Sequence, residues 1–248
     1  MHEPCNHVVH LHGGDTALLR ERAGRFLGEG LAAGEAALVI AAPAHVDAFI
    51  CQLSEDGHDP IGAIRSGRLA LVDAATMLAD VMPAGSLDRD AFMRSVGGTL
   101  SALRVRSGVR RLRAYGEMVG ILWQARRYAD AAVLEGYWNE LLPEEDLSLF
   151  CGYPIDLLDA HLDVEALRPL LAAHTVMESN GPAFDAALSR AIASVLGVPV
   201  PGAELRPGWG PATGLEAVAL WLREAHPKRA GEVLDRAVHY QSSQLRAG

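Results

Sequence analysis

Short apolar segments alternate with longer helical patterns along most of this 248-residue chain. A strand followed by a helix, repeated several times, favours parallel strands because each crossover needs room for a helix. Strands that are apolar on both sides need cover on both faces. The pattern therefore predicts an α/β fold, a three-layer arrangement with a mostly parallel sheet between helices. The strand candidates are HVVHLH at 7–12, AALVIAA at 36–42, RLALVDA at 68–74, GVRRLRAYGEM at 108–118 and LSLFCGYP at 147–154.

Helical periodicity fills the intervals between these strands and changes character after about residue 178. There, an amphipathic segment at 180–197 precedes a Pro/Gly-rich connector at 198–214 and one or two further helices. About 70 residues bury only a small core, so we expect a helical extension of the sheet domain. The predicted division is an α/β domain at 1–178 and an α-helical C-terminal extension at 179–248. Within the first part, the helix candidates are 16–34, 43–55, 75–82, 88–105, most of 119–143 and 164–175.

Charge and cysteine content narrow the class of protein. The formal net charge of −9 disfavours general binding to nucleic acid or to an anionic membrane surface. Five arginines at 104–113 are interpreted as a solvated helix end and turn. No apolar run approaches the roughly 18 residues that span a bilayer, and no signal peptide is visible. Cys5, Cys51 and Cys151 are widely spaced, so we expect no disulfide framework and a cytoplasmic protein.

Ligands of open parallel sheets bind beyond the carboxyl ends of the strands. The residues at the ends of the first, fourth and fifth predicted strands are therefore the candidate ligand-binding residues. These are His10, His12, Gly13, Gly14, Asp15, Tyr115, Glu117, Cys151 and Tyr153.

The stretch HVVHLHGGD at 7–15 allows more than one chemistry. A phosphate loop needs glycine amides followed by a lysine, and no lysine lies near Gly13 and Gly14. Asp15 puts a negative charge near the phosphate position, although it makes a good helix N-cap. Nucleotide hydrolysis is disfavoured, and passive binding of a phosphorylated or acidic ligand stays open.

Metal binding is the second chemistry that this stretch allows. His10 and His12 are two residues apart on a strand and point to the same face, where Glu117 or Cys151 can complete a three-ligand set. We favour the alternative, in which these histidines are hydrogen-bonded core or rim residues.

Glu117 is the most suggestive single carboxylate, because an unpaired charge at the end of a buried strand is costly. It either contacts a ligand, with a perturbed pKa, or forms an ion pair with an arginine such as Arg113 or hydrogen bonds to loop amides. For Trp123, Tyr128 and Trp138 we expect core packing in preference to an aromatic ligand wall. Cys151 is expected to be a small buried apolar residue.

Several sequence segments together resemble the MEDS domain, the methanogen/methylotroph, DcmR-type sensory domain. The resemblance implies a RecA/KaiC-like fold with a degenerate phosphate loop and a sensory role, usually beside histidine kinase or transcription-regulator modules. The chain departs from the common plan because no such module is recognisable after residue 178, and Met177 and Glu178 follow Val176 where the family often has another histidine. The matching segments are RAYGEMVGILW (113–123), LEGYWNELLP (134–143), LSLFCGYP (147–154), His7 and His10, residues 26–40, LVDA (71–74) and AAHT (172–175).

The leading prediction is a non-catalytic, cytoplasmic sensory domain that binds a small molecule at the carboxyl edge of its sheet and signals through its helical tail. No cofactor is indicated. A kinase or regulator is the expected partner, and a homodimer is possible. One alternative is a ligand-free interaction module that uses the helices after residue 178. Another is an enzyme, either a metal-dependent hydrolase using His10, His12 and Glu117 or a residual ATPase.

Overall fold

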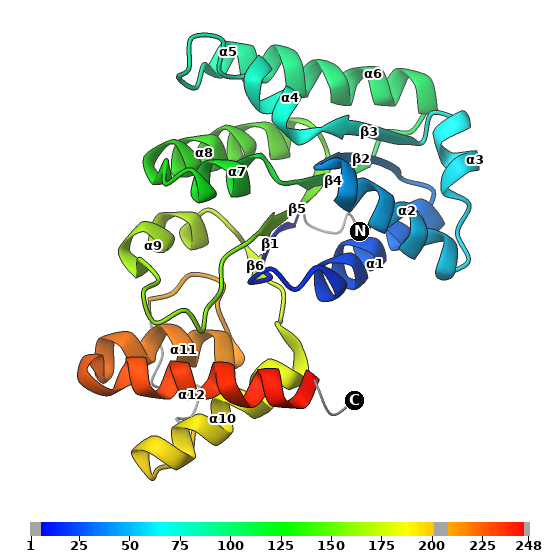
Figure 1. Cartoon of the computed structure of the whole chain (residues 1–248). Helices are drawn as coiled ribbons and strands as arrows, with labels where there is room; N and C mark the ends of the chain where they lie inside the picture. The colour runs from blue at the N-terminus through cyan, green and yellow to red at the C-terminus, as the bar shows by residue number, and fades with distance from the viewer. Residues whose placement is uncertain (1–5, 201–207, 246–248) are drawn as a thin grey trace.

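The computed structural model describes residues 6–200 and 208–245. Its centre is a six-stranded sheet with the order β3-β2-β4-β5-β1-β6, in which every pair of neighbours is parallel (Figure 1). This confirms the predicted α/β fold and the five predicted strands. The strands are β1 His7–Leu11, β2 Ala36–Ala41, β3 Leu69–Asp73, β4 Leu112–Gly116, β5 Leu147–Tyr153 and β6 Val176–Met177. The two-residue β6 was not predicted, because a strand that short leaves no periodic pattern.

Helices cover both faces of the sheet, as the apolar strands require. One face packs against α1 Thr16–Ala32, α2 Pro43–Glu55 and α3 Pro60–Arg65, which share a buried cluster with Val8, Tyr115 and Phe150. The other face and its ends carry α4 Ala74–Asp80, α5 Arg89–Phe92, the π-helical turn η1 Met93–Gly97, α6 Gly98–Ser107, α7 Met118–Gln124, α8 Tyr128–Glu144 and α9 Val164–Ala172.

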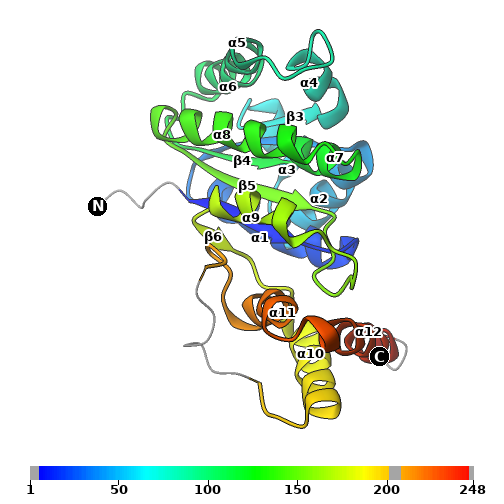
Figure 2. The ribbon, with the colours of Figure 1, turned by 90° about the vertical axis from the view of Figure 1, so that its left-hand side faces the viewer.

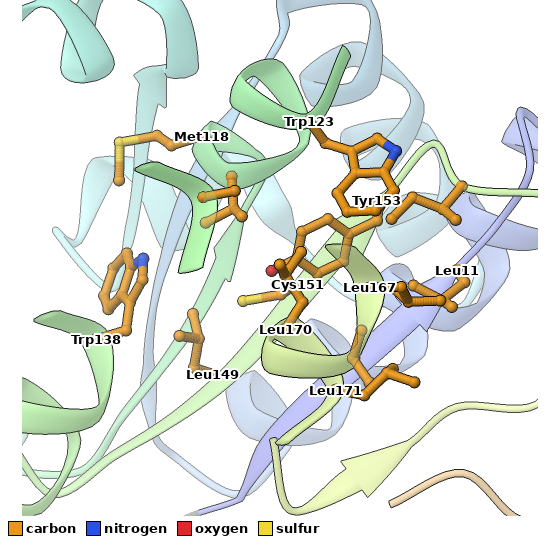
Figure 3. Close-up of a cluster of buried hydrophobic side chains, with 14 of the residues drawn as sticks. Leu11, Met118, Trp123, Trp138, Leu149, Cys151, Tyr153, Leu167, Leu170 and Leu171 are labelled. Carbon is orange, nitrogen blue, oxygen red and sulfur yellow. The ribbon is translucent and has the colours of Figure 1, made fainter. Parts of the chain in front are cut away.

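Alternate residues of β5 contribute to the core on the α8 and α9 side. Leu149, Cys151 and Tyr153 face these helices, and Figure 3 shows them beside Trp138 and leucines of α9. Phe150 points to the opposite face, toward α1. Trp138 is buried, and the Trp123 ring packs 4.5 Å from that of Tyr128, so the expected core role of these aromatic residues is confirmed.

The segment after the sheet folds into α10 Gly181–Leu196, α11 Gly214–Ala225 and α12 Pro227–Leu245, here called the C-terminal helices. They lie beyond the β6 edge of the sheet in both views (Figures 1 and 2). Arg223 fastens them to the sheet domain through hydrogen bonds from its Nη2 to the carbonyls of Leu157 (2.9 Å) and Asp159 (2.8 Å). Arg168 adds a cation–π contact, 4.1 Å from the ring of the buried Trp209.

The hydrophobic core runs without interruption from the sheet into the C-terminal helices. Within this chain the extension packs against its own sheet domain. Within residues 6–200 and 208–245, no helix has both the length and the apolar character needed to cross a bilayer.

Candidate functional site

A cavity of about 250 Å³, here called the edge pocket, opens at the carboxyl edge of the sheet. Its walls are largely apolar, with Pro43, Ala74 and Ile121 among them. Polar side chains converge on this space from several elements, as is typical of ligand pockets at the carboxyl ends of parallel strands. The polar residues that line it are His12, His45, Asp73, Glu117 and Gln124.

Glu117 follows β4 and is held by three donors. Its Oε2 accepts a hydrogen bond from the Ala42 amide (2.9 Å), and its Oε1 accepts one from the Tyr115 hydroxyl (2.9 Å). His45, at the start of α2, pairs with the same Oε1 through Nδ1. The hydrogen bond to Glu117 raises the pKa of His45, against the opposing effect of burial. The carboxylate and imidazole thus form a polar pair at the pocket wall.

Arg113, proposed from the sequence as an ion-pair partner of Glu117, pairs instead with Glu35 (Nε–Oε2 2.6 Å). Arg113 lies at the amino end of β4, and a strand rises about 3.3 Å per residue, so four residues carry Glu117 about 13 Å away. The other structural reading, hydrogen bonding to a backbone amide, is confirmed at Ala42.

His12 lies immediately after β1, and it lines the edge pocket as a neutral imidazole. Burial, followed by the charge on His45, lowers its pKa to about 4. Its Nδ1 accepts a hydrogen bond from the Gly14 amide (3.2 Å), which leaves Nε2–H as the donor of the ring. His12 therefore offers a hydrogen-bond donor beside the acceptor oxygens of Glu117.

The loop after β1 uses its own amides internally. Gly13 N–H bonds to the carbonyl of Ile155 (3.1 Å), Gly14 N–H bonds to His12, and Asp15 N–H bonds to the carbonyl of His12 (2.8 Å). The Asp15 carboxylate accepts from two amides in the first turn of α1, which confirms its predicted N-cap role. The amides that hold phosphate in a phosphate loop are therefore already occupied.

The same loop also lines a second hollow, here called the tail cavity, of about 450 Å³. Residues 12–18 form one side of this cavity, and Asn180, Phe184 and Gln241 of the C-terminal helices and their approach form the other. His12 lines both the edge pocket and the tail cavity. The loop is thus the physical link between the carboxyl edge of the sheet and the tail.

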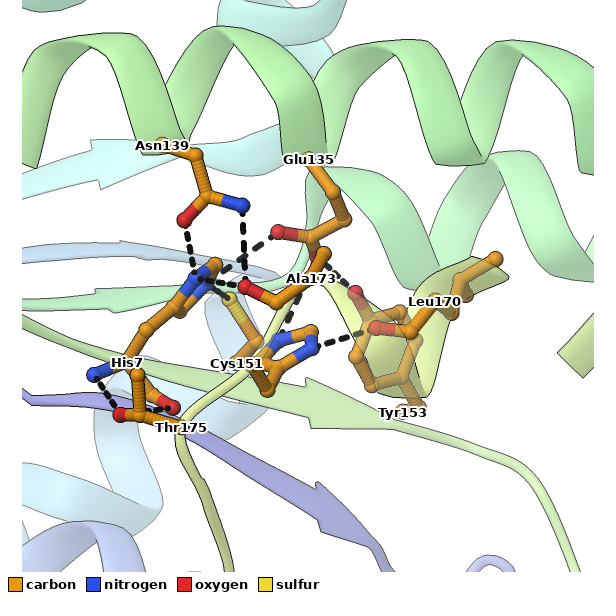
Figure 4. A network of polar contacts seen from close by, with 9 residues as sticks. His7, Glu135, Asn139, Cys151, Tyr153, Leu170, Ala173 and Thr175 are labelled. Carbon is orange, nitrogen blue, oxygen red and sulfur yellow. Dashed lines mark hydrogen bonds and ion pairs between the residues drawn. The ribbon is translucent and has the colours of Figure 1, made fainter. Parts of the chain in front are cut away.

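A separate group of polar residues, the buried tetrad, lies on the α8 and α9 face of the sheet. It consists of His7, Glu135, Cys151 and His174, whose potential ligand atoms all lie within 4.8 Å of one another. Figure 4 shows this network, in which Tyr153 donates its hydroxyl to Glu135. Burial raises the pKa of the Cys151 thiol well above its usual range, and burial lowers the pKa of His174 to about 4.

The sequence-based site residues are therefore divided between two places. The two adjoining cavities are lined by His12, by Glu117 and by the Gly13–Asp15 loop. Tyr115 donates a hydrogen bond to Glu117 from within the core. Cys151 and Tyr153 belong to the buried tetrad and its surroundings, because alternate residues of β5 turn them toward α8. These residues were grouped from the sequence because each lies near the end of a strand. In the structure they are separated because their side chains point to opposite faces of the sheet.

His10 lines neither cavity. It is fully buried on the α1 side, with its ring centre 6.1 Å from those of both Phe150 and His12. Burial, with smaller effects of His12 and Arg22, lowers its pKa to about 3. In the described part of the chain, the potential ligands gathered within 4.8 Å are those of the buried tetrad. The alternative metal set of His10, His12 and Glu117 is not assembled there.

Comparison with protein families identifies the sheet domain. The family described as MEDS, the methanogen/methylotroph, DcmR sensory domain, matches residues 6–175. The chain belongs to the MEDS family. The MEDS match contains all four residues of the buried tetrad and every residue that lines the edge pocket. It ends one residue before β6, so the C-terminal helices lie outside it. Searches of curated proteins and of solved structures found no match.

Two features of this MEDS domain were missed from the sequence although one of them left a signal. Glu135 shares an apolar helix face with Ala131, Trp138 and Leu142, all buried, and a carboxylate on such a face indicates a specific partner. His45 left no comparable signal, because its pairing with Glu117 joins residues 72 positions apart.

Proposed function

We propose that this MEDS domain binds a small molecule in the edge pocket without transforming it and reports the binding through the C-terminal helices. Membership of a sensory-domain family supports the sensory role. The observation that carries the proposal is the convergence of His12, His45 and Glu117 on one cavity with apolar walls. We propose a cytoplasmic location, in keeping with the free Cys51 and Cys151.

The lining of the edge pocket suggests the class of ligand. The volume of about 250 Å³ lies below the roughly 300–1,000 Å³ of sites for drug-sized molecules, which favours a smaller ligand. Asp73 and Glu117 supply acceptor oxygens, and hydrogen bonds from Thr76 lower the pKa of Asp73. We infer a ligand with a short apolar body and a donor head group, such as a hydroxyl or an amine.

Two features support binding without catalysis. The loop amides after β1 are bonded within the protein. The single lysine of the chain, Lys228, lies in α12 and does not line the edge pocket. Glu117 already accepts hydrogen bonds from Ala42, Tyr115 and His45, so its carboxylate oxygens are engaged within the protein.

The route from the pocket to the tail runs through His12. A ligand signals only when it favours one conformation over another. A ligand that hydrogen-bonds to His12 alters the hydrogen bond between the Gly14 amide and His12 Nδ1. The loop that contains Gly14 lies across the tail cavity from Phe184 and Gln241. We propose that the C-terminal helices then alter their contact with a histidine kinase, a transcription regulator or a second copy of the chain.

The decisive experiment blocks the pocket and leaves the fold intact. Ala75 and Ala79 are both exposed on α4, but only Ala75 lines the edge pocket. Native mass spectrometry of the purified protein and ligand-observed NMR with a mixture of short-chain alcohols and primary amines detect binding. We expect binding by the parent chain and by Ala79→Phe, and its loss in Ala75→Phe.

Hydrogen exchange of α10–α12, with and without the probe that binds, tests the signalling step. Faster or slower exchange in these helices supports the proposal. Equal binding by both variants, or no binding by any form, contradicts a sensory edge pocket and favours a ligand-free interaction module.

A further inference from the structure

We propose that the buried tetrad of His7, Glu135, Cys151 and His174 is a closed, four-coordinate Zn²⁺ site. It lies on the α8 and α9 face and is distinct from the edge pocket, so it stands independently of the proposed sensory function. The nitrogen, sulfur and oxygen donors that it offers are those that zinc uses in proteins.

The donor atoms already lie close to the spacing that a tetrahedral ion requires. Bonds of about 2.0–2.3 Å place neighbouring donors of a tetrahedral zinc site about 3.3–3.7 Å apart. Here His7 Nε2 is 3.5 Å from Cys151 Sγ and 3.2 Å from Glu135 Oε2, and His174 Nε2 is 3.7 Å from Glu135 Oε1. The other separations are at most 4.8 Å, so the side chains would close in around a zinc ion.

Both histidines are fixed by acceptors on their outer nitrogens. His7 Nδ1 lies 2.9 Å from Asn139 Oδ1 and 3.0 Å from the carbonyl of Ala173, and both of these groups accept hydrogen bonds (Figure 4). The Asn139 amide is oriented in turn, because its Nδ2 donates to the same carbonyl (2.9 Å). His174 Nδ1 lies 2.7 Å from the carbonyl of Leu170.

The hydrogen-bond acceptors at the two Nδ1 atoms show which nitrogen of each ring carries the proton. Each Nδ1 must carry a proton and donate it outward, so in each neutral ring the Nε2 lone pair faces the centre of the tetrad. This is the arrangement by which partners outside a metal site orient histidine ligands.

With both rings neutral, the centre of the tetrad lacks a positive charge. His174 Nε2 and Glu135 Oε2 are buried without a hydrogen-bond partner among the described residues, although both are polar atoms. Lone pairs that face one another in a buried space repel, and such unsatisfied groups are rare in folded proteins. A cation at the centre supplies the partner that these two atoms lack.

The charges of the donor set balance those of the ion. Cys151 binds as a thiolate after releasing its proton to solvent, and Glu135 binds as a carboxylate, while both histidines stay neutral. The two negative charges compensate Zn²⁺, so the complete site has zero net charge and is suited to full burial. Tyr153, which donates to Glu135 Oε1, holds the carboxylate in place.

The four donors come from four separate segments, and one of these leads to the tail. His7 lies on β1, Cys151 on β5 and Glu135 on α8, whereas His174 follows α9 and precedes β6. Next to it, the Thr175 amide donates to the His7 carbonyl (2.8 Å). A zinc ion would therefore clamp the start of the connection to the C-terminal helices onto the sheet.

The test is to refold the full chain with an excess of Co²⁺ or Zn²⁺, remove unbound metal, and measure metal content and absorption. Refolding gives the ion access to a site that is buried in the folded chain. We expect one equivalent of metal and, with cobalt, a thiolate charge-transfer band together with the visible bands of tetrahedral coordination. Cys151→Ser should abolish the charge-transfer band and weaken zinc binding on the order of 100-fold or more. Cys51→Ser, at an exposed free cysteine, should change neither.

Asn139→Ala provides a second test that does not alter a ligand. Asn139 is exposed, so the variant should fold, and loss of the group that orients His7 should weaken zinc binding by about 10–100-fold. Absence of bound metal after refolding overturns the proposal. The tetrad would then be a hydrogen-bonded network without a metal ion. The proposal is also overturned if the thiolate charge-transfer band of the cobalt form survives in Cys151→Ser or is lost in Cys51→Ser.

Discussion

The hydroxyl of Tyr115 donates a 2.9 Å hydrogen bond to Glu117, and the neighbouring strand leaves room for it only because residue 152 is a glycine. A Cβ atom on Gly152 would lie 2.4 Å from the Tyr115 hydroxyl oxygen. Burial keeps the pKa of Tyr115 well above its usual range, so the phenol stays protonated and remains a donor. The shape of β5 thereby sets the position of the carboxylate in the edge pocket.

Gly152→Ala should lower the free energy of unfolding by about 1–3 kcal/mol, because the added methyl group pushes Tyr115 away from Glu117 in a tightly packed core. Urea denaturation measures the change. Gly136→Ala is the matched control, since a Cβ there meets nothing within 4 Å and alanine suits a helix interior. An equal loss in both variants would show that the Tyr115 contact is not the cause.

Tyr115→Phe should cost about 1.5–3 kcal/mol, because it removes a hydrogen bond to a largely buried carboxylate. In this background Gly152→Ala should be less harmful than in the parent chain, since the oxygen that the new methyl group meets is gone. Urea denaturation of the four chains of this double-mutant cycle gives the coupling energy. Strictly additive effects would contradict the proposed clash.

Acid should destabilise the fold through His10. Its pKa is about 3 in the folded protein and about 6.5 when unfolded, so the unfolded state binds more protons as the pH falls below 6.5. Stability is therefore lost progressively between about pH 7 and pH 3. His10 alone should account for about 2 kcal/mol of the loss between pH 7 and pH 5.

Urea denaturation at these two pH values tests the assignment. The loss of stability in His10→Leu should be about 2 kcal/mol smaller than in the parent chain. His161→Gln removes a histidine whose side chain is 95% exposed and should retain the parent's pH dependence. The same pH dependence in His10→Leu and the parent would mean that His10 accepts a proton without unfolding.

Arg223→Ala should loosen the C-terminal helices, because it leaves the carbonyls of Leu157 and Asp159 without their donor. We expect a loss on the order of 2 kcal/mol in docking free energy and faster proteolysis within α10–α12. Arg25→Ala removes an arginine that pairs with Glu21 of its own helix, away from the C-terminal helices, and should leave the cleavage rate unchanged. Unchanged cleavage in Arg223→Ala would show that the apolar contacts hold the helices without it.

The main strands and helices were predictable because each produces a recognisable pattern in the local sequence. Strands β2, β3 and β5 are short, largely apolar runs, and Asp15 marks the start of α1 as its N-cap. The order of the strands was not predictable, since it depends on which buried faces meet. The break between α7 and α8 was also missed, because it turns on the positive φ of Arg126, which the sequence pattern does not reveal.

The candidate site was only partly predictable for the same reason. Position at a strand end correctly brought His12 and Glu117 to one pocket, because the carboxyl ends of parallel strands share an edge. The side of the sheet to which each residue turns decided the rest. Cys151 points to the face of the sheet that carries Glu135. His45 contacts Glu117 because α2 packs beside the end of β4.

The alternation of side chains along β1 sends its histidines to different surroundings. His7 belongs to the buried tetrad, His10 faces α1, and His12 lines the cavities beyond the strand end. A slip of one residue against β5 would exchange the two faces and remove all three histidines from their present positions. The length of this strand is therefore tightly constrained: a replacement at one histidine changes one environment, whereas a single insertion or deletion would disrupt all three together.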